Sequence, residues 1–208
     1  MILIYLEAPN LSDWLTFIAS FLTFSVSMVT LFVGYRALNT WRNEKRHNII
    51  INALSISTRA KNYIEALRSP AQMEGELDEK IVELYRDKNV PSEVLVIESR
   101  RKNFGNLLND IYLNNEVALI ELGEHHIIHQ YLKKVIEIDS DVLIASDAYA
   151  RLKILIDKEQ IEEPDVRKEL INLRKRVFQF RDDKQFNELS DLYEKLVIFR
   201  QTLTKSIV

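Results

Sequence analysis

Three side chains able to bind a metal ion recur at four-residue intervals in the segment ELGEHHIIH. They are Glu121, His125 and His129, which on an unbroken helix would lie along one face. Two histidines at this spacing can ligate one zinc ion, and a metal-dependent hydrolase would use them together with a carboxylate. However, the glutamate of the HExxH pattern is missing, and Gly123 falls between Glu121 and His125. We therefore expect no bound metal or other cofactor, and we interpret these residues as a polar helix start.

The other sequence signals of catalysis are also missing. The chain has no cysteine, which excludes a thiol nucleophile, a zinc ribbon and a disulfide bond. It contains neither a glycine-rich phosphate-binding loop of the GxxxxGK(S/T) or GxGxxG type nor a GxSxG nucleophile elbow. We therefore expect that this protein is not an enzyme.

One uncharged stretch indicates where the protein lies. Residues 15–34 read LTFIASFLTFSVSMVTLFVG, twenty positions without a charge. A helix of this length covers about 30 Å, which is the hydrocarbon thickness of a bilayer. The residues before it, MILIYLEAPNLSDW, contain no lysine or arginine. The stretch therefore predicts a membrane anchor and not a cleaved signal peptide.

The small residues of this stretch fall on one stripe. Their spacing of 4, 3, 4, 3, 4 and 3 residues is that of a heptad seam. The members of this packing seam are Thr16, Ser20, Thr23, Ser27, Thr30, Gly34 and Ala37. In lipid, helices associate by close backbone approach over small side chains, so we expect a homo-oligomer formed through the span. Two alternatives stay open: hydroxyls bonded within their own helix without a partner, and a water-exposed stripe that lines a pore.

Basic residues follow the apolar stretch directly. This basic collar consists of Arg36, Arg42, Lys45 and Arg46, with only Glu44 opposing it. Because positive charge beside a span stays on the cytoplasmic side, we expect a single-pass protein of the cell (inner) membrane with its N-terminus outside and its C-terminus in the cytoplasm. The collar would also be attracted to anionic membrane lipid, although its role in setting the topology is sufficient to explain it.

Beyond the collar, the charge pattern argues against a nucleic-acid partner. The net charge of the chain is −3, whereas a nucleic-acid surface is broadly basic. The densest remaining basic cluster is Ser99-Arg100-Arg101-Lys102, next to Glu98. On a helix such a cluster is usually a solvated face, and we expect that arrangement here.

The rest of the chain predicts an all-α protein. It has four glycines and four prolines, no strand-like alternation and no Asn-Gly or Asp-Gly hairpin signal. The helix of the span is expected to continue until Ser69-Pro70 stops it, and Ser92 is expected to cap a later helix. Further helices are expected over 77–87, 93–122 with a break near Gly105, 124–138 with an interruption at 139–141, 142–156, 165–181 and 183–205.

These elements suggest three parts. Residues 1–40 would form a short extracytoplasmic tail and a single transmembrane helix, and residues 41–70 a juxtamembrane helical extension. Residues 71–208 would form a cytoplasmic multi-helix bundle, because no linker is long or biased enough to divide them.

The order of these features resembles a loose group of uncharacterised bacterial single-pass membrane-anchored helical proteins. The matching residues are Trp41-Arg42, ALRSP at 66–70, EVALIELG at 116–123 and FNELSDLYEKL at 186–196. The resemblance implies an N-terminal span and a helical body, and it assigns no functional residue. The architecture is also similar to small transmembrane effectors of bacterial anti-phage modules of the retron type.

The sequence therefore favours a membrane protein whose cytoplasmic bundle acts by protein–protein association, with an unknown cytoplasmic protein partner and self-association through the span. The alternative is a membrane-disrupting effector of antiviral defence, in which the bundle holds the spans inactive until a trigger lets them assemble. A metal-dependent hydrolase is the third and least favoured interpretation.

Overall fold

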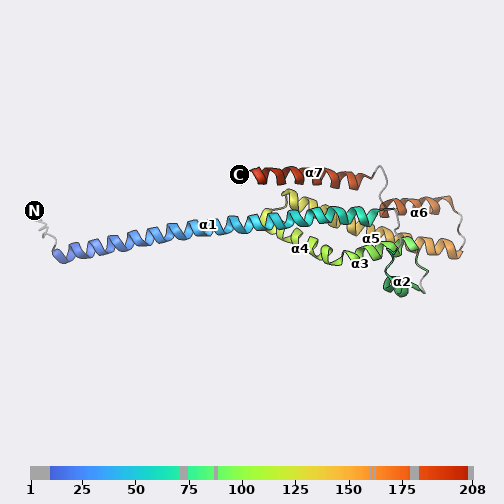
Figure 1. The fold of residues 1–208 in the computed structure, drawn as a ribbon, viewed down its shortest axis with the longest axis horizontal. Helices are drawn as coiled ribbons and strands as arrows, with labels where there is room; N and C mark the ends of the chain where they lie inside the picture. The colour runs from blue at the N-terminus through green and yellow to red at the C-terminus, as the bar shows by residue number, and fades with distance from the viewer. Residues whose placement is uncertain are drawn as a thin grey trace, which may run out of the picture. The chain divides into compact units, whose positions relative to one another are not determined.

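The computed structural model describes residues 10–70, 75–86, 89–159, 161, 163–178 and 183–205. These residues form seven α-helices and no strand, which confirms the predicted all-α class. The helices are α1 (Leu11–Arg68), α2 (Glu79–Tyr85), α3 (Ser92–Asn103), α4 (Gly105–Leu122), α5 (Ile127–Glu159), α6 (Pro164–Val177) and α7 (Lys184–Lys205) (Figure 1). The chain divides into two compact units, Met1–His47 and Asn48–Val208, and α1 continues through the boundary.

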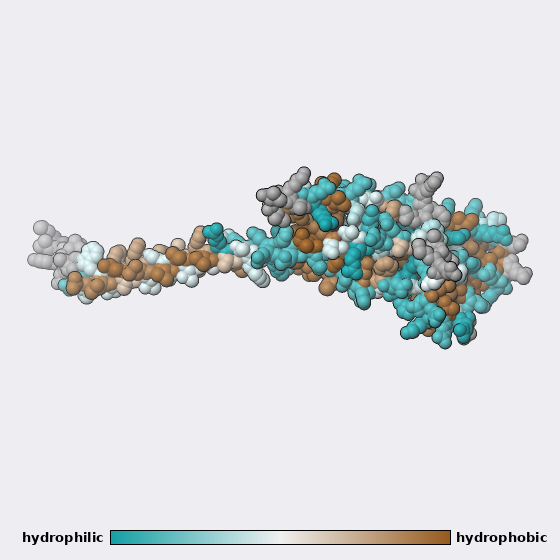
Figure 2. Space-filling view, viewed as in Figure 1, coloured by the Kyte–Doolittle hydropathy of each residue, from teal (hydrophilic) through white to brown (hydrophobic). Residues whose placement is uncertain are grey.

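The first unit contains the apolar part of α1. Within the described residues, α1 is the one helix long and apolar enough to cross a membrane. An 18-residue window of it has a mean hydropathy of 2.0, and none of that window is buried. Figure 2 shows apolar residues along this part of the helix, whereas hydrophilic residues predominate on the visible face of the second unit. Its large side chains are therefore not core residues of this chain, unlike those of a buried helix in a soluble protein.

The second unit is a helical bundle to which α1 contributes its C-terminal part. Ala53, Ala60, Tyr63, Ile64 and Leu67 of α1 have no exposed surface and belong to the main core. The apolar side chains step by three and four residues, which keeps them on one face of the helix. Residues 48–68 are thus a core helix of the bundle, whereas the sequence placed 41–70 in a separate extension.

Helix α5 runs through the middle of the bundle. It packs against α3, α4, α6 and α7. Its residues Tyr131, Leu132, Val135, Ile138 and Val142 are fully buried in the main core. A second, smaller cluster forms where α3, α5 and α6 meet, and its members are Val94, Tyr149, Ala150 and Leu173. Both clusters depend on the length of α5, which reaches from one to the other.

Several helix boundaries differ from the expected ones. The break near Gly105 is confirmed, because α3 ends at Asn103 and α4 begins at Gly105. The expected interruption at 139–141 is wrong, since α5 is continuous there and Asp139 has buried partners that satisfy its side chain. Ser92 does not cap α3: Pro91 occupies that position and makes no side-chain cap hydrogen bond. Helix α6 ends at Val177, and residues 179–181 of the expected helix lie outside the described residues.

Candidate functional site

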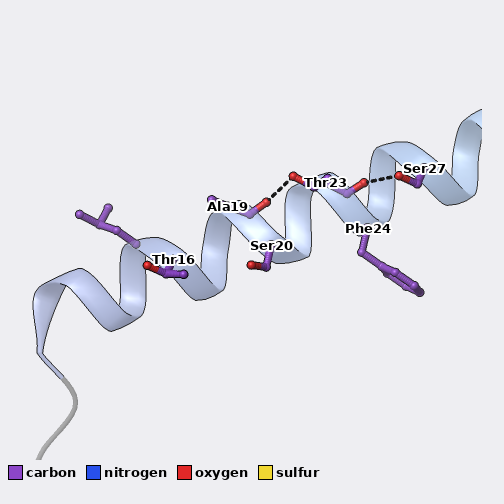
Figure 3. A pocket seen from close by; sticks show the side chains of 7 residues that line it. Thr16, Ala19, Ser20, Thr23, Phe24 and Ser27 are labelled. Carbon is purple, nitrogen blue, oxygen red and sulfur yellow. Dashed lines mark hydrogen bonds between the residues drawn. The ribbon is translucent and has the colours of Figure 1, made fainter.

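The hydroxyl groups of the packing seam bond to their own helix. The side chains of Thr16, Thr23, Ser27 and Thr30 each donate to the carbonyl oxygen four residues earlier, at 2.8–2.9 Å. Figure 3 draws two of these bonds, from Thr23 to Ala19 and from Ser27 to Thr23. Because each hydroxyl has a single proton to donate, two such groups on facing helices cannot bond to each other. These side chains can therefore contact a neighbouring helix closely because they are small, and their oxygen lone pairs can still accept hydrogen bonds from water.

Small side chains hollow the surface of the helix along the first part of the seam. Thr16, Ser20, Thr23 and Ser27 line a shallow groove, together with Ala19, Leu15 and Phe24 (Figure 3). Further along the seam, a Cβ atom added at Gly34 would meet no atom within 4 Å. A larger side chain at Gly34 would thus disturb nothing within this chain. A loss of association caused by such a change would therefore come from what covers the helix.

The basic collar lies on the surface of α1. Arg36, Arg42, Lys45 and Arg46 are all exposed, and so is Ala37, the last residue of the seam. Trp14 and Trp41 are exposed near the two ends of the apolar stretch. Aromatic residues at both ends of an apolar helix are typical of membrane interfaces.

The histidine segment does not form one helix face. Gly123, with φ 96°, ends α4, and α5 begins only at Ile127. Glu121 therefore lies on α4, His125 in the turn and His129 on α5. His129 is buried with its Nδ1 3.4 Å from the Asn115 carbonyl oxygen, whereas His125 is exposed. Within the described residues, no group of three or more His, Cys, Asp or Glu side chains is placed to hold a metal ion.

A basic cluster on α3, residues Ser99–Lys102, holds the C-terminal end of α1. Arg100 is only 4% exposed, and its Nη1 donates to the carbonyl oxygens of Leu67 at 3.2 Å and Ser69 at 2.6 Å. Carbonyls at a helix end have no partner inside the helix, so Arg100 supplies the donors that α1 lacks. The Nε and Nη2 atoms of Arg100 bind the carboxylate of Glu76 at 2.5 and 3.1 Å.

The two ends of the α3 basic cluster hold the start of α2. Ser99 is buried, and its Oγ accepts a hydrogen bond from the backbone N–H of Asp78 at 3.0 Å. Lys102 donates to the Asp78 carboxylate at 2.6 Å, which lowers the pKa of that carboxyl group. Asp78 in turn caps α2 by accepting from the N–H groups of Lys80 and Ile81.

Arg101, the remaining basic residue of the α3 basic cluster, joins α3 to α5 and α1. Arg101 donates from Nε and Nη2 to the two carboxylate oxygens of Asp139, at 3.1 and 3.0 Å. Asp139 is 1% exposed, and it also accepts a hydrogen bond from the hydroxyl of Tyr63. Burial and the charge of Asp139 raise the pKa of Tyr63, so that this tyrosine stays protonated and continues to donate. Three helices thus meet at one buried carboxylate.

Arg68, in the last turn of α1, adds a further link. Its side chain is buried and pairs with the carboxylate of Asp183, which directly precedes α7. Its Nη2 also donates to the carbonyl oxygen of Arg176 near the end of α6, at 3.2 Å. The end of α1 is therefore tied to four other elements of the bundle.

The expectation that the α3 basic cluster is a solvated face is wrong. Ser99 and Arg100 are buried, and each basic side chain pairs with a carboxylate brought in from another part of the chain. Sequence reasoning missed these carboxylates, namely Glu76, Asp78 and Asp139, because nothing in the local pattern shows which charges will meet. An aspartate in the middle of an apolar helical pattern was the one signal that could have pointed to Asp139.

Comparison with protein-family models, curated proteins and solved structures finds no match to this chain. The resemblance to membrane-anchored helical proteins thus stays a prediction from the sequence.

Proposed function

We propose that this chain is a single-pass membrane protein whose helical bundle acts by protein–protein association and not by catalysis. The observation that carries the proposal is the uncovered apolar part of α1. The bundle buries one face of the same helix between Ala53 and Arg68, yet no residue of the most apolar window is buried. Exposing that much apolar surface to water would cost about 25 cal/mol for each Å², so lipid or other apolar helices must cover it.

We further propose that the N-terminus lies outside the cell (inner) membrane and the bundle in the cytoplasm. The exposed basic collar on one side of the apolar stretch supports this orientation. A reporter enzyme that is active only outside the cytoplasm, fused to the C-terminus, should stay inactive. A strongly active fusion would refute the orientation and, with it, the cytoplasmic location of the bundle.

The same proposal includes self-association through the packing seam. The hydroxyls of Thr16, Thr23, Ser27 and Thr30 donate within the helix, so close packing over small side chains is the main contact that the seam offers. The shallow groove beside Ser20 is shaped for such an approach. Membrane lipid would cover the remaining large side chains, and a cytoplasmic protein partner would bind the bundle.

Gly34→Leu tests the seam most directly. A Cβ atom added at Gly34 meets no atom within 4 Å, and leucine favours the helix more than glycine does, so a loss of association would report on a neighbouring helix. We expect it to weaken association by about 1–2 kcal/mol in a bacterial transmembrane-association reporter that carries residues 11–40. Leu22→Phe is the control, because Leu22 is exposed on the side of the helix away from the seam. If both variants associate equally well, the seam contact does not exist.

The membrane-disrupting effector is the second candidate, and one observation favours it. The seam hydroxyls keep oxygen lone pairs on the surface of the helix, where they could face a water-filled path. Expression of the intact protein would then depolarise the membrane and arrest growth. If seam variants keep association but abolish such toxicity, a pore-lining stripe replaces the packing seam as the explanation.

A further inference from the structure

Helix α2 is attached to the bundle by little apolar surface. Among the described helices, α3 is the one against which α2 packs with more than marginal contact. In Figure 1, α2 lies at the edge of the bundle, beside α3. Ile81 is the single buried residue of α2. We call residues 75–86, which are α2 and its flanking residues, the α2 arm. A segment that buries so few apolar side chains opens at a low free energy.

Charged side chains supply much of the attachment that the α2 arm has. Its Glu76 pairs with Arg100 of the α3 basic cluster at 2.5 Å. Its Asp78 pairs with Lys102 of the same cluster at 2.6 Å, and the Asp78 backbone N–H donates to the Oγ atom of Ser99. The arm has four acidic residues and two basic ones. An acidic segment is thus held on a basic cluster, and an attraction of this kind weakens as salt is added.

The two ion pairs differ in their exposure to salt. The side chains of Lys102 and Asp78 are 46% and 22% exposed, so dissolved ions can reach them. The side chains of Arg100 and Glu76 are only 4% and 19% exposed, so that this pair is screened less. Salt should therefore weaken the attachment of the arm in part. Removal of the Glu76 carboxylate should weaken it more, because it leaves Arg100 buried without that partner.

Residues with a positive φ angle lie at both ends of the α2 arm. Gly75, its first residue, has a φ of 79°, and Asn89, three residues past its end, has a φ of 49°. Such residues turn the chain outside a helix, and residues at the ends of an element can absorb the backbone rotation when the element moves. The arm can therefore turn away while α3, which begins at Ser92, keeps its own helix.

We propose that the α2 arm is a latch held by charge, which opens from α3 while the other helices of the bundle stay folded. Opening withdraws the carboxylates of the arm from Arg100 and Lys102, so that these two cations lose these partners. The third cation of the cluster, Arg101, keeps its buried partner Asp139, so the junction of α1, α3 and α5 is retained. This inference goes beyond the proposed function and does not depend on membrane anchoring.

The latch links the surface of the bundle to the end of α1. Arg100 donates to the carbonyl oxygens of Leu67 and Ser69 with one nitrogen, and it binds the Glu76 carboxylate with the other two. When the arm opens, the same guanidinium is a cation at the end of α1 that an acidic group can bind. The latch thus controls access to this cation, and rising ionic strength shifts it toward the open state.

Hydrogen–deuterium exchange of the full-length protein in detergent micelles tests the latch. Mass spectrometry follows the amides of α2, and the amides of α5 between Tyr131 and Ile138, in the main core, are the reference. At about 50 mM sodium chloride the α2 amides should exchange at least about tenfold faster than the reference. At about 500 mM they should exchange about threefold faster again, while the reference is unchanged.

Three results of this experiment would overturn the inference. Equal exchange of α2 and α5 would show that the arm opens only when the bundle unfolds. An α2 rate that does not depend on salt would show that charge does not hold the arm. Exchange of α2 as fast as in an unfolded chain at low salt would show that the arm is not closed at all.

Two substitutions of the same type separate ion pairing from net charge. Glu76→Gln and Glu79→Gln each remove one negative charge from the arm, but Glu79 is exposed and makes no ion pair with the described residues. Glu76→Gln should raise the α2 exchange rate about tenfold, and Glu79→Gln by less than about twofold. Equal effects of the two variants would overturn the inference.

Lys102→Gln tests the salt dependence at an exposed residue, where the change does not threaten the fold. It should raise the α2 exchange rate about threefold at low salt and remove most of the dependence on salt. An unchanged salt dependence in this variant would overturn the inference. In every variant, slow exchange of the α5 reference shows that the bundle is still folded.

Discussion

Removal of the Arg101 side chain should destabilise the bundle strongly, although the change is at a partly exposed residue. Arg101 makes two hydrogen bonds, of 3.1 and 3.0 Å, to Asp139. Asp139 is 1% exposed, so Arg101→Ala leaves a buried carboxylate with the Tyr63 hydroxyl as its remaining donor. Breaking a buried ion pair in this way costs about 3–5 kcal/mol. We expect about 3 kcal/mol, since the Arg101 side chain is 23% exposed and its loss lets some water in.

The chain contains a matched control. Arg151 pairs with Asp147 at 2.9 Å, almost the same distance as the Arg101–Asp139 pair, but these side chains are 79% and 60% exposed. Exposed pairs one helical turn apart contribute about 0.3–0.5 kcal/mol. Arg151→Ala should therefore change the stability by less than about 1 kcal/mol. The two pairs share their residue types and nearly the same distance, and they differ in burial and in joining two helices or one.

The measurement is urea unfolding of the full-length protein in detergent micelles, followed by circular dichroism at 222 nm. With the proposed membrane anchoring, the apolar part of α1 would stay helical in the micelle and add a constant signal, so that the transition would report on the bundle. Replacing the unpaired Asp139 carboxylate as well should recover part of the lost stability. The double variant Arg101→Ala/Asp139→Asn should therefore lower the free energy of unfolding by less than the sum of the two single variants. A buried ion pair at Asp139 would be refuted if Arg101→Ala cost no more stability than Arg151→Ala, or if the effects of the changes at 101 and 139 were additive.

Further predictions concern pH and the core. Because burial and Asp139 raise the pKa of Tyr63 above its ordinary value of about 10, the folded state keeps a proton that the unfolded chain releases at high pH. Each such tyrosine should reduce the free energy of unfolding by about 1.4 kcal/mol per pH unit above pH 10, with no loss below it. Tyr63→Phe should make the stability fall less steeply between pH 10 and 11. The effect should be partial, because burial also raises the pKa of Tyr131. An unchanged slope would contradict the raised pKa of Tyr63. In α7, Leu196→Asp should cost more stability than Leu192→Asp, since Leu196 is buried and Leu192 only half-buried. A larger loss from Leu192→Asp would show that α7 packs with another face against the bundle.

Features that depend on local pattern could be predicted from the sequence alone. The apolar stretch 15–34, the all-α class and the break near Gly105 follow from composition, periodicity and glycine placement. These signals are local because the helix is a local structure: its hydrogen bonds and its face repeat within a few residues. The back-bonded hydroxyls of the seam belong here too, since each one reaches only four residues along its own helix.

Only the tertiary structure decided where charges end up. The α3 basic cluster has the pattern of a solvated face, yet Ser99 and Arg100 are buried and its three basic side chains pair with Glu76, Asp78 and Asp139, which the fold brings to them. The same pairing keeps α5 unbroken through Asp139, where the local pattern indicated an interruption. It is also the packing of the bundle that takes one face of α1, from Ala53 to Leu67, into the core while leaving residues 15–34 of the same helix uncovered. A charged side chain can be buried only where the fold places an oppositely charged side chain beside it, and the local sequence pattern does not show which side chain that will be.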